Sequence, residues 1–112
     1  MTQTQTATID PKAKIVTLIN IYEVLPGKQT ALAELLSAST DKTLRHMPGF
    51  VSVNIHRSTD GNRVANYTQW ASKDEFERMT KNPEAQALFK QFAALAKSVA
   101  PSLYEVSSVH TK

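Results

Sequence analysis

The sequence predicts an α+β fold in which a four-stranded antiparallel sheet carries helices on one face. Three observations lead to this prediction: an apolar, β-rich run that Pro26-Gly27 closes, an Asp60-Gly61 turn between two β-like runs, and two helix-start signals after that turn. With 112 residues the chain can form one core but is too short for two ordinary domains. We therefore expect a single domain.

The first half of the chain predicts a strand followed by a helix. Residues 14–27, "KIVTLINIYEVLPG", are rich in Ile, Val, Leu and Tyr, and both faces of this strand are apolar, so we expect both to be buried. Residues 28–47 carry Leu and Met at helical spacing, and Pro48-Gly49 ends the run. This spacing predicts an amphipathic helix of about five turns. The polar residues 1–13 are interpreted as a tail outside the domain, which spans residues 14–112.

The middle of the chain predicts a β-hairpin. The runs "FVSVNIHRS" (50–58) and "RVANYTQWA" (63–71) flank a turn that contains Asp60-Gly61. An Asp-Gly pair between two β-like runs is a strong local signal for two antiparallel neighbouring strands.

Two helical segments and a last strand follow. Ser72 and Glu75 form a capping box, so a helix begins at Lys73. Asn82-Pro83 is an N-cap with proline at the first helical position, and the apolar stripe after it must end before Pro101. Residues 102–110, "SLYEVSSVH", predict the final strand.

The resulting order is strand, helix, strand, strand, helix, strand, which is the split βαβ or ferredoxin-like arrangement. Its helices cover one face of the sheet and leave the other face open. Because the first strand is apolar on both sides, the open face also needs a cover. A second copy of the chain is the simplest cover, so we predict a homodimer.

The composition excludes several classes of protein. Cysteine is absent, which removes disulfides and thiolate metal sites and suits a reducing cytoplasm, where we expect the protein to act. The thirteen Lys and Arg residues are scattered without a basic cluster, so no nucleic-acid partner is expected. No apolar run approaches the roughly 20 residues that cross a bilayer, so no membrane partner is expected. The three His residues lack ligand-type spacing and the Gly residues form no phosphate-binding loop, so neither a metal nor a nucleotide cofactor is predicted.

Strand alternation suggests a ligand pocket. Asn66 and Trp70 share one face of their strand. If the helices pack on that face, these side chains, together with His56, Phe76 and Phe89, could line an apolar cavity with a few polar groups, the usual composition of a small-molecule site. Trp70 could equally be an ordinary core residue, and Asn66 a hydrogen-bonded sheet residue. Asn20 interrupts an apolar strand and could point into the same cavity or serve the sheet edge.

Residues 58–72, "STDGNRVANYTQWAS", with Gly27 and "MPGF" at 47–50, resemble the antibiotic biosynthesis monooxygenase family. The resemblance covers roughly residues 14–110 and implies a dimeric α+β barrel. The hairpin is most similar to that of small oxygenases that oxidise anthrones to quinones in aromatic polyketide pathways without a cofactor. This resemblance implies that Asn66 and Trp70 line the substrate pocket and take part in oxygenation, and that His56 lies nearby.

The sequence also departs from that family at two positions. Phe76 stands where those enzymes have a pocket Tyr, and Phe89 falls at the position of an Arg, so both are interpreted as substrate-binding positions of altered polarity. The haem-degrading branch has a pocket Asn at the position of Asn20, seven residues before Gly27. Its haem-ligating His falls at or near Phe89, so haem chemistry is the weaker alternative.

The predicted function is a cofactor-independent monooxygenase that uses dioxygen to oxidise a small aromatic or phenolic substrate, anthrone- or hydroquinone-like, to a quinone. Asn66 would stabilise the substrate anion, Trp70 would stack on its ring or donate its indole N–H, and His56 or water would take the proton. Because a fold does not fix chemistry, an isomerase or a small-ligand-binding dimeric barrel is the alternative. A third possibility is a structural barrel with a collapsed cavity.

Overall fold

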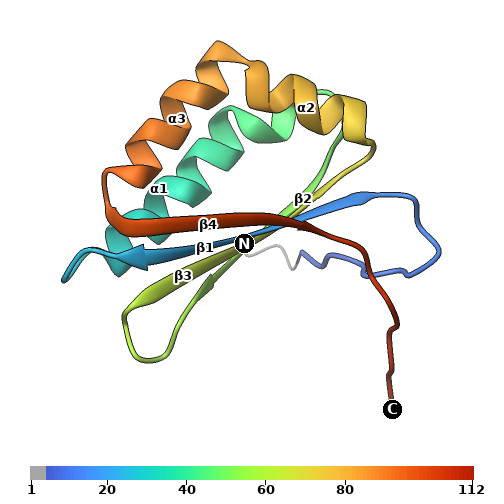
Figure 1. The fold of residues 1–112 in the computed structure, drawn as a ribbon, viewed down its shortest axis with the longest axis horizontal. Helices are drawn as coiled ribbons and strands as arrows, with labels where there is room; N and C mark the ends of the chain where they lie inside the picture. Colours follow the sequence, from blue (N-terminus) through green and yellow to red (C-terminus); the bar gives the residue numbers. More distant parts are fainter. Residues whose placement is uncertain (1–4) are drawn as a thin grey trace.

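The computed structural model describes residues 5–112 and shows an antiparallel sheet with helices on one face (Figure 1). Its sheet order, β2-β3-β1-β4, and the antiparallel pairing of every neighbour confirm the predicted ferredoxin-like α+β fold. The elements are β1 (Val16–Val24), α1 (Gln29–Lys42), the short 3-10 helix η1 (Leu44–His46), β2 (Phe50–Arg57), β3 (Arg63–Trp70), α2 (Lys73–Lys81), α3 (Pro83–Ala93) and β4 (Ala96–Tyr104).

The predicted hairpin turn joins β2 to β3. Gly61 has φ +83°, a left-handed backbone conformation that glycine adopts without steric strain. The Asp60 carboxylate accepts the backbone N–H of Asn62 at 2.9 Å, and the N–H of Ser58 donates to the carbonyl of Arg63 at 3.0 Å. The turn thus fixes which residues of β2 and β3 stand opposite each other.

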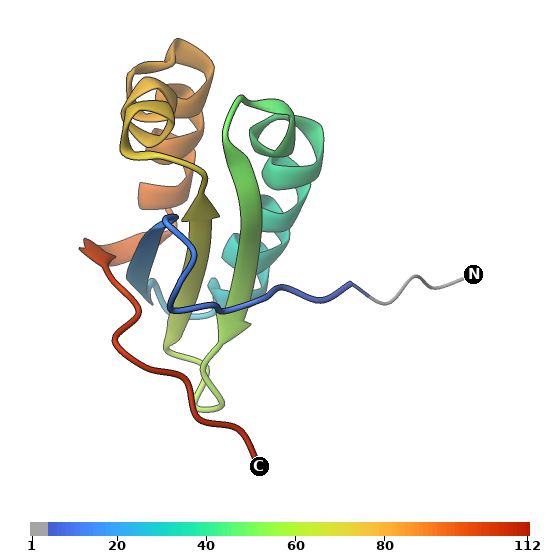
Figure 2. The ribbon, with the colours of Figure 1, turned by 90° about the vertical axis from the view of Figure 1, so that its right-hand side faces the viewer.

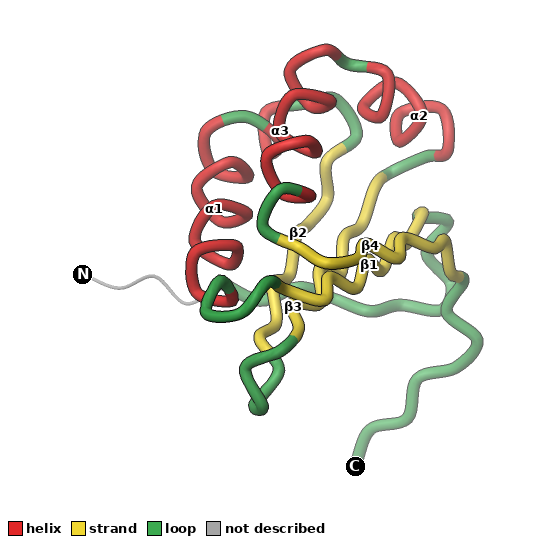
Figure 3. The backbone as a smooth tube through the Cα atoms, turned by 60° about the vertical axis from the view of Figure 1, so that its left-hand side comes forward, coloured by secondary structure: helices red, strands yellow, loops and turns green. Residues whose placement is uncertain are grey.

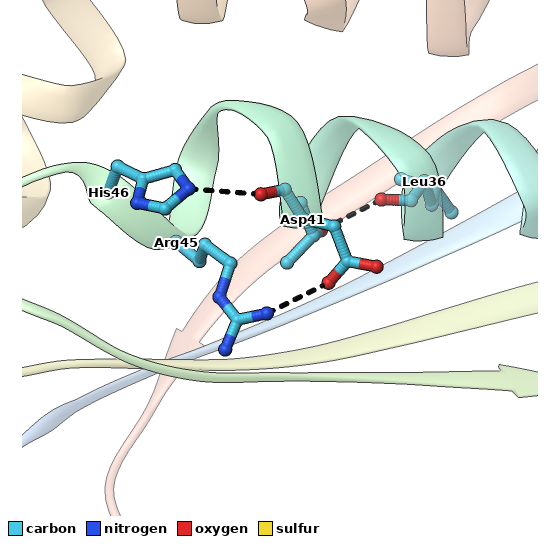
Figure 4. Close-up of polar contacts among 5 residues, drawn as sticks. Leu36, Asp41, Arg45 and His46 are labelled. Atoms are coloured by element: carbon cyan, nitrogen blue, oxygen red, sulfur yellow. Dashed lines mark hydrogen bonds and ion pairs between the residues drawn. The ribbon is translucent and has the colours of Figure 1, made fainter. Parts of the chain in front are cut away.

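The first helix is shorter than the predicted range of 28–47. It ends at Lys42 because Thr43 leaves helical geometry, with φ −128° and ψ −61°, and η1 follows. Figure 4 shows two contacts at the C-terminal end of this helix. Arg45 Nη1 lies 3.2 Å from Asp41 Oδ1, and His46 Nε2 lies 3.1 Å from the Asp41 carbonyl oxygen. Carbonyls at a helix C-terminus lack intrahelical donors, so such side-chain contacts can satisfy them.

Both predicted helix starts are confirmed. The Ser72 hydroxyl accepts the backbone N–H of Glu75 at 3.2 Å, as a capping box requires. The Asn82 side-chain oxygen accepts the N–H groups of Glu84 at 2.8 Å and Ala85 at 3.3 Å. Figure 3 shows the resulting α3 beside α1 above the sheet, with α2 at the start of α3.

The end of the chain differs from the prediction. The last helix stops at Ala93, and the final strand is Ala96–Tyr104 rather than residues 102–110. Pairing with β1 decides the difference: Val99 lies opposite Tyr22, and Pro101 lies inside the strand. A helical pattern is only a weak prior against a paired strand, and proline is tolerated here because β4 is an edge strand.

The core lies between the helices and one face of the sheet, which we call the covered face. On β1 this face carries Leu18, Asn20 and Tyr22, while Ile19 and Ile21 point to the opposite, open face and are half-buried. Two hydrophobic clusters fill the covered side. One contains Tyr22, Val24, Leu32, Leu36, Val64 and Phe92; the other contains Leu44, Trp70, Met79 and Ala85.

The chain itself crosses part of the open face. Figure 2 shows the described segment before β1 crossing the strands on the side away from the helices, with residues 5–7 at the free edge of β2. Gln69 Nε2 donates to the carbonyl oxygen of Thr8 at 2.9 Å and holds this segment in place. Residues 1–4 of the predicted tail lie outside the described part. Within residues 5–112, no helix is long and apolar enough to cross a bilayer.

Candidate active site

A cavity of about 410 Å³ lies between the helices and the covered face of the sheet. Its volume falls within the roughly 300–1,000 Å³ of small-molecule sites, and its walls are mostly apolar and aromatic with a few polar groups. The lining residues are Leu18, Asn20 and Tyr22 of β1, Leu44 of η1, Val53 of β2, Asn66, Thr68 and Trp70 of β3, Phe76, Met79 and Thr80 of α2, Phe89 and Phe92 of α3, and Val99 and Pro101 of β4.

Two carboxamides stand side by side on the sheet where it lines this cavity. Asn20 and Asn66 are directly paired on neighbouring antiparallel strands. The Oδ1 atom of each is buried, and neither has a hydrogen-bond partner among residues 5–112. An unsatisfied buried acceptor costs about 1–3 kcal/mol, so most such atoms in native proteins have a partner. The amide nitrogens of the pair are not among the buried atoms and have no partner within residues 5–112, so they are the groups that can donate to a molecule bound in the cavity.

Trp70 forms a rigid wall beside this pair. It is only 2% exposed, and Phe50 packs edge-on against its ring with centroids 5.6 Å apart. This contact fixes the indole at the end of β3, where it lines the cavity. Trp70 is thus both a core residue and a cavity residue, so the two interpretations of its sequence position are not exclusive.

The structure brings five of the six sequence-predicted site residues together. Asn20, Asn66, Trp70, Phe76 and Phe89 all line the one cavity. For Asn20 this settles the open question of its orientation, because its side chain faces the cavity rather than serving the sheet edge. The cavity is also open rather than filled by its aromatic walls, which argues against a collapsed barrel.

The placement of His56 in the cavity is wrong. His56 stands opposite Ala65, so it lies on the open face, where it is exposed. Ile55 is the β2 residue opposite Asn66. Alternation alone does not say which set of β2 residues shares a face with Asn66. The register decides that: Ser58 pairs with Arg63 at the turn, which places Ile55 opposite Asn66 and His56 opposite Ala65.

The sequence also matches a known protein family. The model of the antibiotic biosynthesis monooxygenase family matches residues 15–91. The chain belongs to that family. Tetracenomycin-F1 monooxygenase of Streptomyces glaucescens is 45% identical over 83 residues, which is 74% of each chain. The predicted family and the predicted monooxygenase class are therefore confirmed.

Solved structures of two oxygenases share the fold. A monooxygenase from the gene ActVA-Orf6 of Streptomyces coelicolor, solved in complex with the ligand nanaomycin D, superposes with a TM-score of 0.79 at 26% identity, covering 92% of this chain and 96% of that one. SnoaB, a cofactor-independent oxygenase from Streptomyces nogalater, superposes with a TM-score of 0.76 at 25% identity, covering 89% and 100%.

The walls of this monooxygenase's cavity carry no charged side chain and no His within the described residues. Residues 5–112 also contain no cluster of three or more His, Cys, Asp or Glu that could hold a metal ion. A side chain that could act as a general base is thus missing from the walls. The polar groups in contact with the cavity are amides, hydroxyls and the Trp70 indole, which bind and orient rather than titrate near neutral pH.

The sequence analysis missed Tyr22, Thr68 and Thr80, whose side chains also line the cavity. Tyr22 could have been found by alternation, because it stands two residues after Asn20 on the same face of β1. Thr80 depends on the packing angle of α2, which the sequence does not reveal.

A second hollow, of about 480 Å³, lies outside the fold's core at the free edge of β2. Its walls include residues 5–7 and polar side chains such as Ser37, Thr40 and Asp41. Among residues 5–112, Phe50 is the only aromatic residue in its walls, and the hollow lacks the unpartnered buried amides of the covered-face cavity. The covered-face cavity is therefore the better candidate for an active site.

Proposed function

We propose that this family member is a cofactor-independent monooxygenase that oxidises a small aromatic substrate, an anthrone or hydroquinone, to a quinone with dioxygen. The observation that carries the proposal is the cross-strand pair Asn20 and Asn66, two carboxamides without side-chain partners that line an otherwise apolar cavity. The name of the curated relative, a tetracenomycin-F1 monooxygenase, and the description of SnoaB as a cofactor-independent oxygenase support it.

In the proposed reaction of an anthrone, the substrate supplies the electrons. Loss of an acidic proton gives an enolate or phenolate, which passes one electron to dioxygen. Recombination of the two radicals forms a C–O bond and a peroxide. Cleavage of the O–O bond leaves one oxygen atom as the new quinone carbonyl, and the other departs as water with the two hydrogens that the substrate loses.

Asn20 and Asn66 would orient the substrate and stabilise its anion. A carboxamide offers one acceptor oxygen and two N–H donors, so the pair can accept a substrate hydroxyl or a water and can donate to a developing oxyanion. Donors that are already in place in a dry site stabilise such charge without reorganisation. Trp70 would hold the ring plane in position beside them.

Proton removal falls to water or to prior ionisation of the substrate, because within residues 5–112 no Asp, Glu, His, Lys or Arg lines the cavity and burial raises the pKa of the Tyr22 phenol to about 12. His56 is exposed on the other face of the sheet and takes no part. We therefore expect the pH dependence of turnover to follow the pKa of each substrate rather than that of a His side chain.

The test is oxygen uptake by chelator-treated protein with a panel of anthrones and hydroquinones. We expect Asn66→Ala to lower kcat by about 100-fold or more, the size found when one oxyanion donor is removed. Asn54→Ala is the matched control, because Asn54 lies on the open face of the adjacent strand, and it should keep full activity per folded molecule. Bound substrate without any uptake would instead favour an isomerase or a ligand-binding barrel.

We also propose that the protein acts as a homodimer. Val99, Leu103 and Tyr104 of the edge strand β4 are 39%, 49% and 51% exposed, an unusual concentration of large apolar side chains on one edge. Val99 and Pro101 also line the cavity, so a second copy packed along β4 would cover this edge and close that side of the site.

Sedimentation of the wild-type protein and of Leu103→Lys tests this assembly. We expect a dimer for the wild type, and a shift toward monomer with reduced oxygen uptake for Leu103→Lys. Lys97→Ala is the control, since Lys97 is an exposed polar residue on the same strand. A wild-type monomer at assay concentration would refute the homodimer.

A further inference from the structure

Tyr22 is a further polar residue whose side chain lines the cavity. It follows Asn20 by two positions on β1, so both side chains leave the same face of the strand. Its ring is 5% exposed and packs in an apolar cluster with Leu36, Val64 and Phe92. This packing holds the ring in one position.

The Tyr22 hydroxyl is neither bonded to the protein nor sealed away from accessible space. No residue of 5–112 forms a hydrogen bond with it, yet the buried, unpartnered side-chain atoms in that range are only those of Asn20 and Asn66. The accessible space that Tyr22 lines is the cavity. Phenylalanine would fill the same apolar cluster without placing a hydroxyl there, and burying an unbonded hydroxyl is unfavourable. Packing therefore explains the ring of Tyr22 but not its hydroxyl.

We propose that Tyr22 is a substrate-binding residue of this monooxygenase, whose hydroxyl donates a hydrogen bond to a second oxygen atom of the substrate. The inference rests on the proposed function only in taking the cavity as the substrate site. Two residues along a strand correspond to about 7 Å, so Asn20 and Tyr22 provide two separate polar positions. A ligand that reaches both has to carry oxygen at two well-separated positions, as a polyoxygenated fused-ring substrate does and a simple monophenol does not.

The ionisation state of Tyr22 agrees with a donor role. Desolvation by burial raises the pKa of its phenol to about 12. The hydroxyl therefore stays protonated across the range in which an oxygenase would be assayed. Tyr22 can donate a hydrogen bond to the substrate in this range but cannot remove the substrate's proton.

The test compares Tyr22→Phe with wild type on two substrates, an anthrone that carries ring hydroxyls and the parent anthrone that lacks them. For the hydroxylated substrate we expect kcat/KM to fall about three- to tenfold, the size of one net hydrogen bond, and for the parent no change. Tyr67→Phe is the matched control, because Tyr67 points to the open face and should change neither value.

Binding of the matching hydroxylated and parent anthraquinones, titrated in the absence of turnover, separates this inference from the proposed function. Tyr22→Phe should weaken the binding of only the hydroxylated quinone, by the same three- to tenfold factor. The same loss for both ligands, or no loss for either, would overturn the proposal. A lower melting temperature with unchanged discrimination would likewise show a structural hydroxyl and overturn it. Absence of oxygen uptake with selective quinone binding would refute the monooxygenase reaction but uphold the role of Tyr22.

Discussion

The amide side chains on the two faces of the sheet differ in whether they form hydrogen bonds within the protein. On the open face, Gln69 donates to the carbonyl of Thr8 at 2.9 Å and accepts the Ser52 hydroxyl at 2.6 Å. Asn54 donates to the Ser52 hydroxyl at 3.0 Å and to the carbonyl of Tyr67 at 3.1 Å. These side chains form a connected network within the protein.

On the covered face, Asn20 and Asn66 stand directly opposite each other without such partners for their oxygens. Both pairs of amides come from the same few strands, so the difference is not one of secondary structure. The open face shows that this sheet can satisfy buried amides. The covered face instead leaves two amides without protein partners beside a cavity, and their N–H groups are the donors that it offers to a ligand.

The largest effect is expected from Trp70→Ala. Trp70 is 2% exposed, and its removal leaves a large cavity, so the free energy of unfolding should fall by about 3–5 kcal/mol. Denaturant unfolding measures this. Tyr67→Ala, on the half-buried open face, should cause a clearly smaller loss. Equal losses would mean that the covered face is not the better packed of the two.

Removal of the facing amides should affect activity and not stability. Asn20→Ala and Asn66→Ala should each reduce turnover by about 100-fold, and the double variant should be little worse, because the two groups act as a unit. Their free energy of unfolding should stay unchanged or rise, since an unsatisfied acceptor is removed. Oxygen uptake and thermal unfolding of the three variants give both values. Strictly multiplicative losses would contradict a joint role.

Tyr22 makes the covered face sensitive to alkali. The unfolded phenol loses its proton near pH 10 and the folded one at about pH 12, so the unfolded state binds fewer protons between these values. The contribution of Tyr22 to the free energy of unfolding is therefore fully present below about pH 10. It is lost as the pH rises through 12, which lowers the free energy of unfolding by roughly 2–3 kcal/mol. Chemical unfolding at several pH values should show this loss, and Tyr22→Phe should lack it.

The smallest effect concerns the open face. Gln69→Leu removes the bonds to Thr8 and Ser52, so the free energy of unfolding should fall by about 1–3 kcal/mol. Oxygen uptake per folded molecule should be unchanged, because Gln69 does not line the cavity. Urea unfolding with activity measured on the same samples tests both statements. A loss of activity without a loss of stability would give the open face a role in catalysis.

Local signals accounted for much of the fold. The Asp60-Gly61 turn, the capping box at Ser72 and the N-cap at Asn82 each depend on a few adjacent residues, and each appears where predicted. The position of β4 could not be found this way, because residues 96–101 continue a helical apolar pattern and become a strand only by pairing with β1.

The sequence by itself determined the order of elements, the shared face of Asn66 and Trp70, and the family motif of residues 58–72. These features follow from backbone sterics, side-chain alternation and local hydrogen bonding, which act within a few residues. Only the tertiary structure decided that Asn20, and with it Tyr22 on the same face of β1, points into the cavity beside Asn66, and that His56 lies on the other side. The physical reason is that strand register and helix packing bring together residues far apart in the chain, and a shift of one residue moves every side chain of a strand to the opposite face.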